Sequence, residues 1–199
     1  GPDYIDPMFH TAVLGVPSRN LDLFFEDEAG IRSQLARHIR PDGFGVIEGV
    51  MGFYDGLGGV SERSSAWEVA DLTDTPVILL VDMKGRSLSA LASINGFLDY
   101  KEKSHVTGIV FNRLSPMLYP GLKERAEREL GIRVFGYVPE LKDLTLESRH
   151  LGHVMPEEIP GIRDRLDLFK EKVRVEIYLD GIIEEAGRAA EIEVKLPEA

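Results

Sequence analysis

The chain has 199 residues, 43% hydrophobic and 29% charged, a composition typical of a folded domain with a sizeable core rather than a disordered segment. Its 34 acidic and 23 basic residues give a net charge of −11, which argues against a nucleic-acid partner, and the absence of cysteine excludes disulfides and a cysteine nucleophile within these residues. No apolar run approaches the roughly 20 residues that span a membrane. The first residues do not form a signal peptide, so we expect a cytoplasmic protein without a membrane partner.

Short, nearly continuous apolar runs predict parallel strands that are buried on both faces of a sheet. These runs lie at residues 44–47, 76–81, 106–111 and 134–138. Apolar residues at helical spacing predict helices over residues 31–39, 88–98, 122–130, 161–172 and 175–186. Strands that alternate with helices predict an α/β fold, with a mostly parallel sheet and helices on both faces.

The predicted strands run into Glu48, Asp82, Asn112 and Pro139. Ligands of open α/β sheets bind beyond the carboxyl ends of the strands, so these positions are a candidate site. Polar residues also follow strands simply because loops are polar, and for any single residue that alternative stays open. Glu48 is the strongest candidate, because an acidic residue at the end of a core strand often binds Mg²⁺ beside nucleotide phosphates.

A glycine-rich loop, residues 51–59, follows Glu48 and would allow close approach of the backbone to a ligand. Its alternative is a flexible surface loop. The opening motif places Asp3, Tyr4 and Asp6 between prolines that stiffen the segment, although by itself an ordinary turn explains it better.

Three cationic residues in predicted loops could grip an anionic group. They are Arg19, Arg149 and His150, and each could equally be a surface feature. No G-x-x-x-x-G-K-[ST] phosphate-binding loop occurs in the sequence, and no lysine follows the glycine cluster at residues 56–59.

Taken together, these segments resemble the cobyrinic acid a,c-diamide synthase family in order and spacing over most of the chain. The matching pieces are GPDYIDP (1–7), HTAVLGVPSRNLD (10–22), VIEGVMGFYDGLGG (46–59), PVILLVDMKGRSLSALASINGF (76–97), GIVFNRL (108–114), GYVPE (136–140) and ESRHLG (147–152). The combination of GPDYIDP with HTA and PSRNLD distinguishes this family from the related cobyric acid synthases and from dethiobiotin synthetase.

The resemblance implies a P-loop NTPase fold of the dethiobiotin synthetase type and an ATP-dependent, glutamine-dependent amide ligase. The family amidates the a and c acetate carboxylates of a corrinoid in cobalamin biosynthesis. This chain departs from the family because it lacks the first strand with its P-loop and the glutaminase domain, so we expect it to be inactive alone. We expect residues 1–172 to form the synthetase domain and residues 173–199 to form a C-terminal helix and the start of a linker.

The resemblance also implies roles for individual residues. Glu48 and Asp3 would be catalytic residues that bind Mg²⁺, and ATP is the second expected cofactor. The remaining expected roles are substrate binding for Tyr4, Asp6, Arg19, Arg149 and His150, and nucleotide binding for Asn112, Arg113 and Pro139. The expected partners are a corrinoid or related tetrapyrrole, ammonia from a glutaminase domain and a segment that carries the P-loop, with a homodimer left open.

Two alternatives to the amide ligase remain at this point. One is a nucleotide-binding or tetrapyrrole-binding protein that has lost its P-loop and its activity. The other is a switch of the MinD/ParA type that acts through a protein partner.

Overall fold

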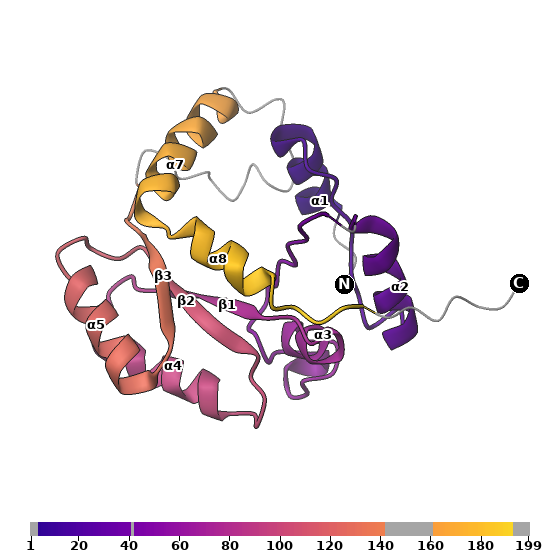
Figure 1. Cartoon of the computed structure of the whole chain (residues 1–199), viewed down its shortest axis with the longest axis horizontal. Coiled ribbons are helices and arrows are strands. Elements are labelled where there is room, and N and C mark those ends of the chain that lie inside the picture. Colours follow the sequence, from indigo (N-terminus) through magenta and orange to yellow (C-terminus); the bar gives the residue numbers. More distant parts are fainter. Residues whose placement is uncertain (1–3, 41, 142–160, 193–199) are drawn as a thin grey trace, which may run out of the picture.

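The computed structural model describes residues 4–40, 42–141 and 161–192, and its elements are arranged around a small parallel sheet (Figure 1). The strands are β1 (Val77–Asp82), β2 (Val106–Asn112) and β3 (Arg133–Val138). The helices are α1 (Ile5–Phe9), η1 (His10–Leu14), α2 (Glu28–His38), η2 (Leu57–Gly59), α3 (Ala66–Thr73), α4 (Ser89–Asp99), α5 (Tyr119–Leu130), α7 (Ile162–Glu176) and α8 (Leu179–Ala186).

The sheet has the order β1-β2-β3, and both pairs of neighbouring strands are parallel. Helix α4 connects β1 to β2 and α5 connects β2 to β3, and both helices lie on the side of the sheet opposite to α8 (Figure 1). The α/β fold with helices on both faces is therefore confirmed. Residues of α4 and α5 pack in one core layer and residues of α7 and α8 in the other, which explains why β2 and β3 need apolar side chains on both faces.

Alternate residues of β2 divide the core into two layers. Ile109 and Phe111 are fully buried in the larger layer, against residues of α4 and α5. Val110 points to the smaller layer, where Phe135 and Ile177 are also buried. Gly108 has no room for a side chain, because a Cβ there would collide with the ring of Phe135. Successive side chains of β2 therefore pack into the two core layers in turn, because side chains along a strand alternate between the two faces of a sheet.

The strand predicted at residues 44–47 is not present, which corrects the expected sheet from four strands to three among the described residues. Phe44 and Val46 are 54% and 81% exposed, and the segment pairs with none of the described strands. The outer edge of β1 likewise pairs with no described strand, and its Leu80 is 67% exposed. An apolar run becomes a strand only when a neighbouring backbone supplies its hydrogen bonds, and that partner is not local in sequence.

The outer edge of β3 is covered by the junction between α7 and α8. The Tyr178 amide donates to the carbonyl of Phe135 at 2.7 Å, and Ile177 forms an isolated antiparallel bridge with Gly136. This pairing breaks the helical path, because Ile177 takes an extended conformation. The predicted ends of the last two helices are therefore wrong: the first continues to Glu176 instead of ending at residue 172, and the second starts at Leu179 instead of residue 175.

The buried face of α8 also differs from the apolar stripe that the sequence predicts. Ile183, a member of the predicted stripe, is 56% exposed, whereas Glu185 is only 3% exposed. Arg133 of β3 and Arg188 donate to Glu185 Oε1 at 3.1 and 2.9 Å, which compensates for burying the carboxylate. The predicted boundary between the synthetase domain (residues 1–172) and the C-terminal helix with its linker (residues 173–199) falls inside α7, and this division into domains stays a prediction.

Replacing Glu185 by Ala is expected to lower the free energy of unfolding by about 1–2 kcal/mol, because the substitution removes the buried acceptor that fixes α8 to β3. Glu184→Ala is the matched control. Glu184 is also bonded to Arg133, at 3.1 Å, but its side chain is 55% exposed, so its loss should cost less than about 0.5 kcal/mol. Urea unfolding followed by circular dichroism measures both, and equal effects would contradict the structural role of Glu185.

The helix α3 was not predicted, although its start carries a clear local signal. Ser65 is the N-cap and accepts a hydrogen bond from the Glu68 amide at 3.1 Å, while Glu68 accepts from the Ser64 amide. The arrangement is similar to a capping box, except that the Glu68 side chain accepts from the residue before the N-cap and not from the N-cap itself. Within the described ranges, no helix has the length and apolar character to cross a membrane.

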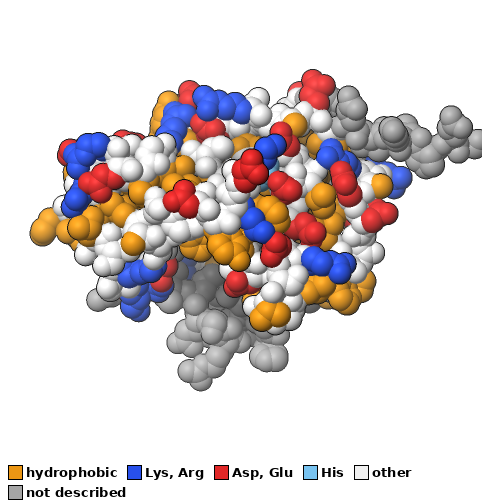
Figure 2. All heavy atoms as spheres, turned by 90° about the horizontal axis from the view of Figure 1, so that it is seen from below, with side chains coloured by type: hydrophobic (Ala, Val, Ile, Leu, Met, Phe, Trp, Pro, Cys, Tyr) orange, Lys and Arg blue, Asp and Glu red, His pale blue; other side chains and the backbone are white. Residues whose placement is uncertain are grey.

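Charged side chains of both signs are interspersed on the face shown in Figure 2. Helix α5 carries three ion pairs at i, i+4 spacing, which are Lys123–Glu127, Arg125–Glu129 and Glu124–Arg128. Such pairs support an exposed helix weakly and leave no large single-sign field on its surface. The net charge of −11 is therefore not a guide to where an anionic ligand would bind.

Candidate active site at the carboxyl edge of the sheet

Three of the predicted strand-end positions lie together at the carboxyl edge of the sheet. Asp82, Asn112 and Val138 are aligned in register on neighbouring strands, and Pro139 follows Val138 directly. Parallel strands end at the same edge, so this alignment follows from the topology. The edge therefore presents a carboxylate, an amide and a proline on neighbouring strand ends.

Arg113, directly after β2, is held by Asp82 at the end of β1. Its Nε donates to Asp82 Oδ1 at 2.7 Å, and its Nη2 contacts Oδ2. The same Oδ1 accepts from the Lys84 amide at 3.1 Å. The hydrogen bond from Arg113 is the largest of the effects that lower the pKa of Asp82, and the same bond raises the pKa of Arg113. Both groups are therefore ionised at neutral pH.

Glu48 lies in the extended segment before the glycine-rich loop, with its side chain 58% exposed. His10 Nε2, from η1, lies 3.5 Å from Glu48 Oε2, and His10 Nδ1 lies 3.4 Å from the hydroxyl of Ser18. The structure thus brings the segment after the opening motif next to the predicted metal ligand. His10 was missed as a site residue, and the signal that could have revealed it is its place in the HTA motif.

The other predicted site residues are less constrained by the structure. Tyr4, before α1, is 78% exposed, Asp6 on α1 is half-buried, and Arg19 is exposed. Among the described residues, neither Tyr4 nor Arg19 forms a hydrogen bond or ion pair with Glu48 or Asp82. Asp3, Arg149 and His150 lie outside the described residues.

Glu48 is available to bind a metal ion but cannot form a complete site by itself. The described residues contain no group of three His, Asp or Glu side chains that could hold a metal. Mg²⁺ usually keeps several waters and takes one or two carboxylates plus phosphate oxygens of the substrate, so a single exposed carboxylate is compatible with it. The donor set therefore fits an ion that arrives with a nucleotide rather than a permanently bound one.

The glycine-rich loop after Glu48 has a fixed base and an exposed tip. Phe53 is buried at the base, and the hydroxyl of Tyr54 donates to the carbonyl of Phe97 on α4 at 2.7 Å. At the tip, Gly58 and Gly59 have φ values of +68° and +71°, a conformation that favours glycine. Within the loop, the amides of Gly56, Leu57 and Gly59 donate to the carbonyls of Ser61, Arg63 and Gly56 at 2.8, 2.9 and 3.1 Å, so internal hydrogen bonds also hold the tip.

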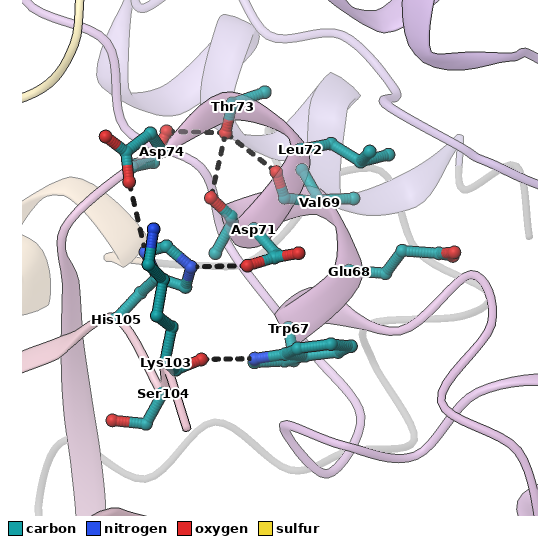
Figure 3. Close-up of polar contacts among 12 residues, drawn as sticks. Trp67, Glu68, Val69, Asp71, Leu72, Thr73, Asp74, Lys103, Ser104 and His105 are labelled. Atoms are coloured by element: carbon teal, nitrogen blue, oxygen red, sulfur yellow. Dashed lines mark hydrogen bonds and ion pairs between the residues drawn. The ribbon is translucent and has the colours of Figure 1, made fainter. Parts of the chain in front are cut away.

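The opposite edge of the sheet carries a second polar cluster, shown in Figure 3. His105, just before β2, lies between Asp71 and Asp74, with nitrogen–oxygen distances of 2.7 and 3.5 Å. The Trp67 ring nitrogen donates to the Lys103 carbonyl at 3.0 Å nearby. These contacts join α3 to the start of β2 at the amino edge, away from the ligand-binding edge, and we interpret them as structural.

Two hollows of the described surface do not coincide with the candidate site. One, of about 340 Å³, lies between residues 23–28 and 63–72, and the other, of about 520 Å³, lies between α5, β3 and α7. Neither is lined by Glu48, Asp82 or Arg113. The candidate site at the carboxyl edge of the sheet is therefore separate from both of these hollows.

Comparison with known proteins finds curated relatives that are named cobyrinate a,c-diamide synthase. The chain is 38% identical over 180 residues to a cobyrinate a,c-diamide synthase of Clostridium tetani, a match that covers 90% of this chain and 40% of that protein. It is 36% identical over 200 residues to the synthase of Listeria monocytogenes, covering 100% and 44%. The synthase of Methanocaldococcus jannaschii is 38% identical over 187 residues, covering 92% and 42%.

No family model matches the chain, and no solved structure matches it. The chain spans about two fifths of the length of the curated relatives that it matches. The similarity to proteins from bacteria and an archaeon extends over nine tenths or more of this chain and includes the segments that surround the candidate site. By sequence, the chain is a member of the cobyrinate a,c-diamide synthase family and corresponds to a part of those enzymes.

Proposed function

We propose that this chain forms the synthetase part of an amide ligase that uses ATP and glutamine-derived ammonia to amidate the a and c acetate carboxylates of a corrinoid. The observation that carries the proposal is the identity of 36–38% with cobyrinate a,c-diamide synthases over 90–100% of the chain. The aligned polar strand ends support it, because a parallel sheet binds ligands at that edge. Nothing in the fold favours the switch or the inactive binding protein.

The proposed reaction needs an activated carboxylate, because a carboxylate in water does not react with ammonia at a useful rate. Transfer of the γ-phosphoryl group of ATP to a carboxylate oxygen gives an acyl phosphate and ADP. Ammonia then attacks the acyl carbon, and phosphate leaves as the amide forms. Both steps depend mainly on positioning and on neutralising the charge of the phosphoryl oxygens.

The chain's own residues would serve this reaction at the carboxyl edge. Glu48, with Asp3, would hold Mg²⁺, which supplies charge neutralisation at the phosphates when bound. Asn112 and Arg113 would bind the nucleotide, with Pro139 packing beside it. The residues that we propose for the substrate carboxylates and their surroundings are Tyr4, Asp6, Arg19, Arg149 and His150.

The proposal is tested by assay of a full-length enzyme that contains this segment, supplied with ATP, Mg²⁺, glutamine and cobyrinic acid. We expect two amides and two ADP to form per corrinoid. Metal-free and nickel-bearing tetrapyrroles serve as competing substrates that define the specificity. Formation of ADP without any amide, on every tetrapyrrole supplied, would contradict the proposed ligase.

The 199-residue chain alone is expected to bind Mg-ATP with a dissociation constant no tighter than about 1 mM. The sequence holds no phosphate-binding loop of the G-x-x-x-x-G-K-[ST] type, whose backbone N–H groups and lysine usually supply most of the phosphate contacts. Isothermal titration calorimetry measures the affinity, with the full-length enzyme as the positive control. Micromolar affinity of the chain alone would show that another segment, such as the tip at Gly58 and Gly59, binds the phosphates.

A further inference from the structure

The pair formed by Asp82 and Arg113 has a geometry that an ordinary surface ion pair lacks. The guanidinium engages both oxygens of the carboxylate, with the Nε–Oδ1 distance at 2.7 Å. A two-point contact of this kind fixes the plane of the guanidinium as well as its position. The pair lies between the carboxyl ends of two neighbouring strands, where Asp82 is in register with Asn112.

The backbone that carries Arg113 is also fixed. Arg113 has a φ of +57°, a left-handed conformation that non-glycine residues adopt rarely and that tends to occur at functional sites. Two hydrogen bonds tie the strand ends around it: the Met83 amide donates to Asn112 at 2.8 Å, and the Leu114 amide donates to Val138 at 3.1 Å. Met83 and Leu114 are buried, so the base of the side chain has little freedom.

Arg113 keeps donors for a ligand while Asp82 holds it. A guanidinium has five N–H donors, and the contact with Asp82 uses two of them. Among the described residues, no acceptor is recorded for Nη1, and the side chain is 39% exposed. Glu140 is the other carboxylate whose charge acts on Arg113. The remaining donors thus lie at the edge of the sheet where a ligand would bind.

We propose that Asp82 is the positioning residue of Arg113: it holds the guanidinium so that its remaining N–H donors face the phosphate-bearing ligand at the carboxyl edge. The inference rests on the proposed function, in which Arg113 contacts the nucleotide. An exposed ion pair contributes little to stability, so the effect of losing Asp82 should be on ligand binding rather than on folding.

A double-mutant cycle in the full-length enzyme tests this role. Asp82→Asn should raise the KM for ATP about tenfold and leave kcat within about twofold, because it removes an interaction that serves the ground state and the transition state alike. In an Arg113→Ala background the same substitution should change the KM less than about twofold. Asp71→Asn, which breaks the ion pair with His105 at the opposite edge of the sheet, is the matched control and should not change the KM.

A second readout, on the 199-residue chain, separates this inference from the proposed function. In nitrogen-15 NMR spectra, the Arg113 Nε–H should give a shifted, slowly exchanging signal in the parent chain and lose it in Asp82→Asn. An unchanged Nε–H signal would overturn the inference, as would an equal rise in KM in both backgrounds, or a lost signal with an unchanged KM. If the parent enzyme does not use ATP at all, the proposed function fails first and the role of Asp82 fails with it, even where the NMR signal behaves as expected.

Discussion

Glu48→Gln, in a full-length enzyme that contains this segment, is expected to lower the rate of amidation by about two orders of magnitude or more. Glutamine keeps the size and hydrogen-bonding shape of the side chain but removes the charge that would hold Mg²⁺ at the phosphates. Loss of one key electrostatic contact in a transition state has an effect of this scale. The rate is measured as amide formed per enzyme at saturating ATP, with glutamine hydrolysis followed in the same samples.

The fold should tolerate this substitution, because the side chain of Glu48 is 58% exposed and its recorded contact is with His10 at 3.5 Å. The melting temperature and the hydrolysis of glutamine should therefore stay close to those of the parent enzyme. Glu102→Gln, at an exposed loop position, is the control for adding an amide to the surface and should change neither activity. Amidation at the parent rate would falsify the metal-binding role of Glu48. A parallel loss of both activities and of the melting temperature would instead identify it as a folding residue.

Gly136→Ala is expected to lower the free energy of unfolding by about 3 kcal/mol or more. Gly136 has a φ of +140°, which L-residues rarely adopt. A Cβ at this position would also collide with the Glu176 carbonyl oxygen and lie 2.9 Å from the Cα of Ile177. Both contacts are with backbone atoms, so they are relieved only if the junction of α7 and α8 moves off the edge of β3.

Gly121→Ala is the matched control for this substitution, because nothing lies within 4 Å of a Cβ added there. Gly121 lies in α5, where alanine should stabilise the chain by about 0.5–1 kcal/mol. Urea unfolding followed by the fluorescence of Trp67, the single tryptophan, reports on both variants. If Gly136→Ala unfolds at the same urea concentration as the parent chain, the close backbone contact between Gly136 and the junction of α7 and α8 is contradicted.

The sequence was sufficient to predict the three paired strands, because each is a nearly continuous apolar run and a helix of clear periodicity separates each from the next. β2 illustrates this: Ile109, Val110 and Phe111 are consecutive apolar residues and all three are buried. The helix at α5 was equally clear, with Pro120 in its first turn and Gly131 in the left-handed conformation just after it. Local signals of this kind need no knowledge of neighbouring elements.

The candidate site was only partly predictable. The alignment of Asp82 with Asn112 follows from parallel pairing, so the sequence could place both at one edge. The bidentate contact of Arg113, its left-handed backbone and the approach of His10 to Glu48 could not be predicted. The two contacts join side chains that are 31 and 38 residues apart in the chain, and the backbone conformation of Arg113 has no local glycine signal.

The sequence by itself determined the α/β class, the three parallel strands and their crossover helices, since these follow from local patterns. It also determined the relation to cobyrinate a,c-diamide synthases, which follows from the order of the motifs. Tertiary structure alone decided which apolar segments became strands and which face of α8 was buried. Residues 44–47 have the composition of a strand but pair with no strand in the described part of the chain, because a strand depends on hydrogen bonds from a neighbour distant in sequence. Glu185 is buried in place of Ile183 because Arg133, 52 residues away, compensates its charge.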